Sequence, residues 1–207
     1  EGCHTAITGP SGCGKTTLVR MLLGFTVPQS GEVLVDGIPL SQLSIRSYRR
    51  QLGVVMQTAR VNAGSIYDVI CGGLYYSELE VWEALERAAV ADEIRAMPMQ
   101  LETMLSDSGG NISGGQLQRV AIASALITQP KVLILDEATS ALDNRSQKHI
   151  TDVINGLGIT RISIAHRLST IQQADQIVVI EKGCPAESGS WNDLKGHGYL
   201  RRMLQGH

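Results

Sequence analysis

Short apolar runs alternate along the chain with longer stretches in which apolar residues recur every three or four positions. A short apolar run bounded by turn residues is typical of a buried strand, and the longer period is typical of a helix packed on one face. We therefore predict buried strands at residues 3–8, 52–56, 131–135, 161–165 and 177–180, and a half-buried strand at 31–37. We predict helices at residues 17–23, 65–71, 78–91, 115–128, 144–155, 190–195 and 197–204. This alternation predicts an α/β fold with a mostly parallel sheet flanked by helices.

Residues 58–128 differ from the rest because helical patterns follow one another there without a strong strand between them. We predict that this stretch is a helical subdomain inserted into an α/β core formed by residues 1–57 and 129–207. Within it, one helical stripe is expected to pack inward, made of Leu79, Trp82, Leu85, Ala88 and Ala89. The polar stretch 40–50, which contains Arg46, Arg49 and Arg50, is expected to be a solvated connection.

Composition narrows the class of protein. The 207 residues suit one domain, and a net charge of -2 with 4% aromatic residues disfavours a nucleic-acid partner. The four cysteines lie far apart, which predicts free thiols in a reducing compartment. No apolar run approaches the roughly 18 residues that a transmembrane helix needs, and no secretory signal is recognisable. Because a buried strand begins almost at residue 1, we expect a domain truncated at its N-terminus.

A glycine-rich loop between the first strand and the first helix fits the pattern G-x-x-x-x-G-K-[ST]. Its residues are Gly9, Pro10, Ser11, Gly12, Cys13, Gly14, Lys15 and Thr16. Such a loop turns backbone N–H groups toward phosphate oxygens, and the helix that follows adds its own unpaired N–H groups. We expect Lys15 to contact the β- and γ-phosphates, the Thr16 hydroxyl to bind Mg²⁺, and Thr17 to reach the α-phosphate. The alternative, an ordinary glycine turn, is disfavoured by the complete pattern in this context.

A second glycine-rich turn, at residues 108–116, opens another helix. It places Ser113, Gly114, Gly115 and Gln116 at a helix N-terminus, where an anion is also favoured. An ordinary glycine-rich cap is the alternative at this position.

Polar residues follow three of the predicted parallel strands. They are Gln57, the pair Asp136 and Glu137, and His166. In open α/β sheets ligands gather at the carboxyl ends of the strands. Adjacent carboxylates beyond a buried strand are costly unless they serve a cation or a proton. Asp136 can hold Mg²⁺ through water, and Glu137 can polarise an attacking water.

In this order, the motifs resemble those of the nucleotide-binding domain of ATP-binding cassette (ABC) transporters, and the resemblance covers nearly the whole chain. The matching segments are residues 9–16 (Walker A), Gln57 (Q-loop), residues 112–116 (the L-S-G-G-Q signature, with Ile for Leu), residues 132–136 (Walker B), Glu137 (catalytic base), residues 140–143 (D-loop) and His166 (switch histidine). Residues 138–143 and 164–170 are similar to the exporter branch. Residues 63–66 and 72–74 are similar to bacterial peptide and bacteriocin exporters.

The resemblance implies an ATPase that uses ATP and Mg²⁺ to drive export across a membrane. Thr16, Gln57 and Asp136 would be the metal ligands, and Lys15, Glu137 and His166 the catalytic residues. Two copies would meet head to tail, so that each ATP lies between residues 9–17 with Gln57 of one copy and residues 113–116 of the other. Asp143 would also belong to this nucleotide site.

The resemblance also implies transmembrane domains as partners, in the same polypeptide, and a place at the cytoplasmic face of the cell membrane for this chain, itself soluble. The family's adenine-stacking aromatic precedes Walker A and is not in this chain. A Ser106-Asp107 pair stands where exporters have Gly-Glu, which puts that contact with the membrane domains in question. Three alternatives are a non-transport ABC ATPase, a regulatory nucleotide binder without turnover, and a P-loop kinase or GTPase.

Overall fold

The computed structural model describes residues 2–56, 63–106, 111–138, 142–165, 167–196 and 198–205. The chain divides into two compact units. Unit 1 comprises residues 1–52, 134–137 and 160–207, and unit 2 comprises residues 53–133 and 138–159. Each unit is described by itself below. None of the described helices is both long and apolar enough to cross a membrane.

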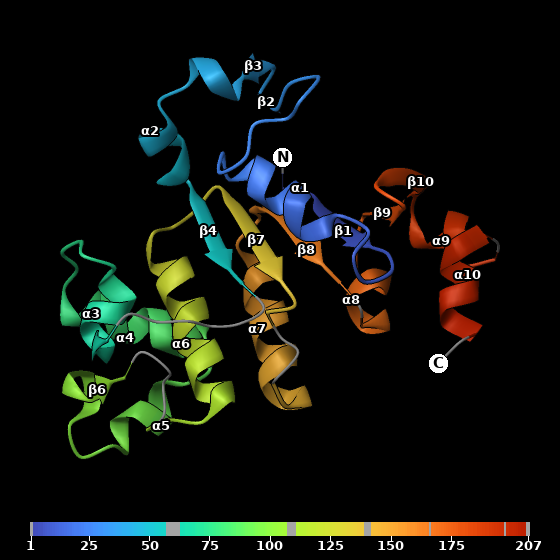
Figure 1. The fold of residues 1–207 in the computed structure, drawn as a ribbon. Helices are drawn as coiled ribbons and strands as arrows, with labels where there is room; N and C mark the ends of the chain where they lie inside the picture. Colours follow the sequence, from blue (N-terminus) through green and yellow to red (C-terminus); the bar gives the residue numbers. More distant parts are fainter. Residues whose placement is uncertain are drawn as a thin grey trace. The chain divides into compact units, whose positions relative to one another are not determined.

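The main sheet has six strands in the order β10-β9-β1-β8-β7-β4. Its strands are β1 (His4–Thr8), β4 (Leu52–Val55), β7 (Val132–Asp136), β8 (Thr160–Ile164), β9 (Gln176–Glu181) and β10 (Cys184–Gly189). β1 pairs in parallel with β8 on one side and β9 on the other, so that Ala6 lies between Ser163 and Ile177. β10 runs antiparallel to β9. The predicted α/β fold with a mostly parallel sheet is confirmed (Figure 1).

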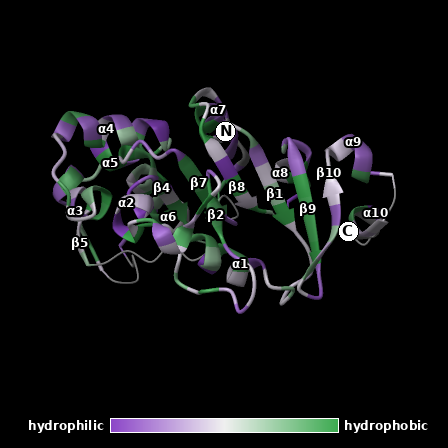
Figure 2. Cartoon of the chain, turned by 90° about the horizontal axis from the view of Figure 1, so that it is seen from above, coloured by the Kyte–Doolittle hydropathy of each residue, from purple (hydrophilic) through white to green (hydrophobic). Residues whose placement is uncertain are grey.

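The core of unit 1 explains why its strands are apolar runs. A strand that is buried on both faces has apolar side chains on both of them. Figure 2 accordingly shows β7 and β9 as largely hydrophobic ribbons. Small and branched side chains from β1 and β9 pack beneath three short helices, α8 (Leu168–Gln172), α9 (Trp191–Leu194) and α10 (Gly198–Gln205). The buried members of this core are Ala6, Ala165, Ile171, Ala174, Ile177, Val179, Leu194 and Leu200.

The region after α1 (Lys15–Leu22) differs from its prediction. The predicted strand at 31–37 is reduced to β2 (Leu34–Val35), which forms a small hairpin with β3 (Ile38–Pro39). A short 3-10 turn η1 (Leu40–Gln42) and α2 (Ile45–Arg49) follow. Arg46 and Arg50 are exposed, as predicted. Arg49 differs from the prediction: it is half-buried, and its guanidinium donates hydrogen bonds to the carbonyl oxygens of Leu23 at 3.0 Å and Gly24 at 3.1 Å. These carbonyls end helix α1, where a cation is favoured.

Unit 2 is mostly helical. Besides most of β4 and the start of β7, it contains β5 (Gly64–Ser65), α3 (Ile66–Cys71), α4 (Glu78–Arg87), α5 (Ala91–Arg95), η2 (Gln100–Glu102), β6 (Met104–Leu105), α6 (Gly114–Ile127) and α7 (Asn144–Gly156). α3 and α4 both pack against α6, and the three helices are the teal to yellow-green ribbons of Figure 1. α6 is consequently buried on nearly all sides, and even Gln118 and Arg119 are enclosed.

Two details of unit 2 correct the sequence predictions. The predicted helix at 78–91 ends early, because Ala89 takes a left-handed backbone with φ of 57° between α4 and α5. Of the predicted inward stripe, Leu85 and Ala88 are buried, whereas Leu79 is 69% exposed. Val81 and Ala84 complete the buried face of α4. β5 and β6 pair as a two-residue antiparallel ladder, in the region predicted to contain no strong strand.

Candidate functional site

The phosphate-loop sequence connects β1 to α1 within unit 1, as predicted. Gly9 is buried with φ of +150°, and a Cβ atom there would lie 2.1 Å from the carbonyl oxygen of Ile180. Gly14, directly before the helix, has φ of 104°. Both backbone conformations favour glycine, which accounts for the glycines at these positions.

The ammonium group of Lys15 folds back over this loop. Its Nζ donates hydrogen bonds to the carbonyl oxygens of Gly9 and Pro10, both at 2.9 Å, and lies 3.7 Å from the Cys13 sulfur. The loop therefore holds a buried positive charge against its own backbone. Thr16 and Thr17 in the first turn of α1 are exposed. Gly14 supplies no side-chain cap, and no acidic residue lies in that turn. The helix end is therefore electrostatically suited to an anion.

The carboxyl ends of three strands meet at one edge of the sheet in unit 1. The N–H of Ala165, after β8, donates to the Ile7 carbonyl near the end of β1 at 3.0 Å. The N–H of Glu137, after β7, donates to the Ile164 carbonyl at the end of β8 at 3.3 Å. This places Glu137 at the same edge as the phosphate loop, with one strand, β8, between β1 and β7.

The backbone at the two adjacent carboxylates is unusual. Asp136 ends β7 and is buried, whereas Glu137 is half-buried and takes a left-handed conformation with φ of 51°. A residue other than glycine in this region is strained, and such strain clusters at functional sites. The bend turns the chain out of the strand directly at the two acidic residues.

The signature turn begins helix α6 of unit 2. The Ser113 hydroxyl accepts the backbone N–H of Gln116 at 3.2 Å, and the Gln116 side-chain oxygen accepts the N–H of Ser113 at 2.8 Å. This reciprocal pair is a capping box. Ser113 and Gly114 are exposed at the helix end.

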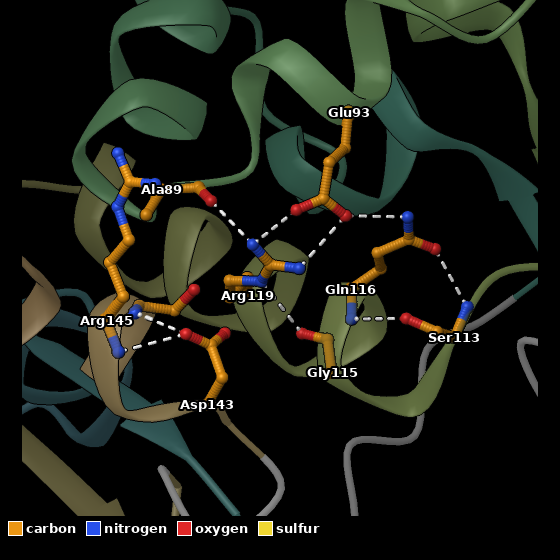
Figure 3. Close-up of polar contacts among 9 residues, drawn as sticks. Ala89, Glu93, Ser113, Gly115, Gln116, Arg119, Asp143 and Arg145 are labelled. Carbon is orange, nitrogen blue, oxygen red and sulfur yellow. Dashed lines mark hydrogen bonds and ion pairs between the residues drawn. The ribbon is translucent and has the colours of Figure 1, made fainter.

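A buried arginine one turn further along α6 connects this turn to α5 (Figure 3). Arg119 forms an ion pair with Glu93, whose oxygens lie 2.6 Å and 3.0 Å from two guanidinium nitrogens. The same guanidinium donates to the carbonyl oxygens of Ala89 and Gly115. The Gln116 amide nitrogen donates to Glu93 at 2.7 Å. Sequence reasoning missed Glu93 and Arg119, since no motif pointed to either.

Asp143 caps the other long helix of unit 2. One of its carboxylate oxygens accepts the backbone N–H groups of Arg145 and Ser146, both at 3.0 Å, at the start of α7. Hydrogen bonds from Ser146 foremost, and then from Arg145, hold the pKa of the Asp143 carboxyl below its ordinary value. The side chain proposed for the nucleotide site thus also fixes the entrance to α7.

The predicted site residues fall into three groups. Residues 9–17, Asp136 and Glu137 share unit 1, and Ser113 to Gln116 with Asp143 share unit 2. Gln57 and His166 lie outside the described residues, as does Asp107. Within the described ranges, no cluster of three or more histidine, cysteine or acidic side chains is arranged to hold a metal ion. All four cysteines are free thiols.

Comparison with known proteins gives one consistent family. A family model described as "ABC transporter" matches residues 1–140. Multidrug resistance protein 4 of Entamoeba histolytica is 46% identical over 214 residues, covering 99% of this chain and 16% of that protein. An ATP-dependent lipid A-core flippase of Burkholderia orbicola is 44% identical over 201 residues, covering 96% of this chain and 34% of that protein. The chain thus spans 16% and 34% of the length of these two relatives.

A solved structure agrees with the sequence comparisons. It is described as a bacterial Atm1-family ABC exporter with ATP bound. The two superpose with a TM-score of 0.95 at 40% sequence identity, over 99% of this chain and 36% of the other.

Proposed function

The chain belongs to the ABC transporter family of ATPases, and we propose that residues 1–207 act as one nucleotide-binding domain whose ATP hydrolysis drives export across a membrane. The observation that carries this proposal is the sheet edge of unit 1. There the loop that holds Lys15 follows β1, and Glu137 follows β7, one strand away. A phosphate group and the residue that activates water for its transfer require such proximity.

In this proposal Lys15 exchanges its two loop carbonyls for oxygens of the β- and γ-phosphates. The backbone N–H groups of residues 9–16 and the start of α1 surround the phosphates, and the Thr17 hydroxyl contacts the α-phosphate. The exchange replaces neutral acceptors by charged ones, so the ammonium gains stronger hydrogen bonds without further desolvation.

We propose that Mg²⁺ would be held by oxygen donors from the start of α1 and the end of β7. The Thr16 hydroxyl and the Asp136 carboxylate offer the oxygen ligands that this ion prefers, and Gln57 is proposed as a further oxygen ligand. Bound there with ATP, such an ion would neutralise phosphate charge. Asp136 is proposed to act through a water molecule.

Hydrolysis is proposed to depend on Glu137 and His166. The Glu137 carboxylate orients and polarises the attacking water, and His166 stabilises charge on the γ-phosphate. Most of the rate enhancement then comes from positioning and electrostatic stabilisation.

A second copy of the domain is proposed to complete each site. Ser113, Gly114, Gly115, Gln116 and Asp143 of one copy would face the nucleotide held by the other, head to tail. Transmembrane domains in the same polypeptide are proposed to convert this closure into transport at the cytoplasmic face of the membrane. The much greater length of the relatives supports this arrangement.

The substrate is proposed at the level of class only. The relatives carry the names of multidrug and lipid exporters, which supports an amphipathic or apolar cargo. Peptide export, predicted from residues 63–66 and 72–74, stays a prediction. Transport assays of the full-length protein with peptide, lipid and drug probes measure which class is moved.

Phosphate release from Mg-ATP tests the proposed function. Glu137→Gln should lower the steady-state rate by about 100-fold or more, because the carboxylate that activates water is lost. Glu83→Gln, at an exposed position of α4, removes the same charge elsewhere and should leave the rate unchanged. Turnover that survives in Glu137→Gln would contradict the base assignment. A wild-type chain that binds ATP without turnover would instead indicate a regulatory nucleotide binder.

A further inference from the structure

In the part of the chain that the structure describes, four helices begin with a capping box, and the box at Ser113 differs chemically from the other three. In three of them the residue that completes the box is acidic, and its carboxylate accepts the serine hydroxyl proton. These contacts are Ser65 to Asp68 at 2.8 Å, Ser77 to Glu80 at 2.7 Å, and Ser190 to Asp193 at 2.6 Å. At Ser113 the partner is Gln116, and the Ser113 hydroxyl donates to no group among the residues that the structure describes.

The hydroxyl of Ser113 is therefore left as a hydrogen-bond donor. One of its lone pairs accepts the backbone N–H of Gln116, so its proton stays free for a partner outside the box. Oxygens of a γ-phosphate only accept hydrogen bonds, so the proposed nucleotide sandwich requires a donor on the facing copy. The Ser113 hydroxyl is such a donor.

The orientation of the Gln116 amide decides whether this arrangement persists. Only the amide oxygen can accept the Ser113 N–H, and a rotated amide would place its NH₂ group against that donor. The Glu93 carboxylate, which can only accept, lies 2.7 Å from the amide nitrogen and so fixes the nitrogen on its side. Arg119, which is 8% exposed, holds both carboxylate oxygens of Glu93 in place.

We infer that Glu93 and Arg119 are positioning residues of the ATPase site: they lock the Gln116 amide, which keeps the Ser113 hydroxyl proton available to the γ-phosphate of ATP bound by a second copy (Figure 3). In this arrangement both polar atoms of the Gln116 side chain are engaged within the chain. Gln116 then acts on the nucleotide indirectly, because its side chain fixes the conformation of the turn that carries Ser113. This inference rests on the proposed function.

The test separates ATP binding from dimer closure, using the Glu137→Gln background to prevent turnover. Glu93→Gln keeps the side-chain size but places an NH₂ group against the donors of Arg119 or Gln116. It should leave the Kd for ATP within about twofold, since the phosphate loop belongs to unit 1. It should weaken ATP-dependent dimerisation by about tenfold, the effect of losing one charge-assisted hydrogen bond.

Two further variants make the experiment specific. Glu86→Gln is the matched control, because Glu86 pairs with Arg95 at 2.6 Å and makes no bond to the signature turn. It should dimerise as the background does. Gln116→Glu should convert the turn to the form of the other three boxes, in which the carboxylate takes the serine proton, and should weaken dimerisation at least as much as Glu93→Gln.

A structural readout makes the test independent of dimerisation. Amide hydrogen exchange at Ser113 and Gln116 should accelerate in Glu93→Gln, while exchange at Ser77 and Glu80 stays unchanged. Should Glu93→Gln fail to fold, Glu93→Asp, which keeps the charge but shortens the side chain, replaces it. Dimerisation and exchange equal to those of Glu86→Gln would overturn the positioning role and leave the proposed function intact. A background chain that binds no ATP, or binds it without dimerising, would contradict the proposed function and this inference with it.

Discussion

The Lys15 ammonium donates a hydrogen bond of 2.9 Å to the carbonyl oxygen of Gly9, six residues earlier in the same loop. Lys15 is only 8% exposed, so most of its desolvation has already taken place when the chain folds. A phosphate that enters the loop meets a charge held in position by neutral acceptors, which it can replace with stronger ionic ones.

Lys15→Met should therefore weaken ATP binding by about 100-fold, because one or more charge-assisted hydrogen bonds to phosphate are lost. Equilibrium titration with a fluorescent ATP analogue measures the Kd. Lys131→Met, at an exposed position, is the control and should bind as the wild type does. Equal affinity in both variants would show that the nucleotide does not use this loop.

Gly9→Ala should destabilise unit 1 by roughly 3 kcal/mol, since the new Cβ would lie 2.1 Å from the Ile180 carbonyl oxygen in a strained backbone region. Gly156→Ala is the matched control. No atom lies within 4 Å of its added Cβ, and helix propensity predicts a change of less than about 1 kcal/mol in the stabilising direction. Urea denaturation midpoints compare the two. A Gly9→Ala chain as stable as wild type would contradict the close approach of the loop to β9.

His4 makes the stability of unit 1 depend on pH. Burial, and then the neighbouring Arg161, lower the pKa of His4 to about 4, and its ring nitrogens lie 2.9 Å from Ser163 Oγ and from an Arg161 nitrogen. The unfolded chain, with a histidine pKa near 6.5, binds this proton more tightly. The contribution is thus fully present above about pH 6.5 and is lost as the pH falls to 4, by about 3 kcal/mol in total.

Urea unfolding at pH 7 and pH 4 measures this effect in the wild type and in His4→Gln. Because carboxylates also titrate in this interval, the difference between the two proteins isolates the histidine. The wild type should lose about 3 kcal/mol more than the variant on acidification. Parallel losses would show that His4 titrates in the folded chain as it does in the unfolded one.

The elements that could be predicted from sequence are those whose signal is local. β7 is a continuous apolar run, and the phosphate loop carries its glycines at fixed spacing, so both were found at nearly their observed bounds. β10 was not predicted, because the alternation of apolar and polar residues that is typical of a strand is absent from Cys184–Gly189. This segment is a strand because it pairs with β9. The sequence did not predict that α4 ends before Ala89 either. Alanine favours a helix, and tertiary structure overrides this preference here.

The site residues also divide into those with a local sequence signal and those that depend on contacts between distant parts of the chain. Lys15 and Glu137 could be named because motif and strand end coincide. Glu93 could not, since its partners Gln116 and Arg119 lie 23 and 26 positions away and meet it only when α5 packs beside α6. Arg49 was misjudged for a similar reason, because the carbonyls it caps end a helix 25 and 26 positions earlier.

The central claim, that this chain clamps ATP between two copies of itself and hydrolyses it, is tested most directly by light scattering of Glu137→Gln with and without Mg-ATP. The account predicts a monomer without nucleotide and twice that mass with it. Ser113→Arg, which places a bulky side chain at the proposed contact, should keep the protein monomeric while ATP still binds. A Glu137→Gln chain that binds Mg-ATP and remains a monomer, or a Ser113→Arg variant that dimerises normally, would contradict the account.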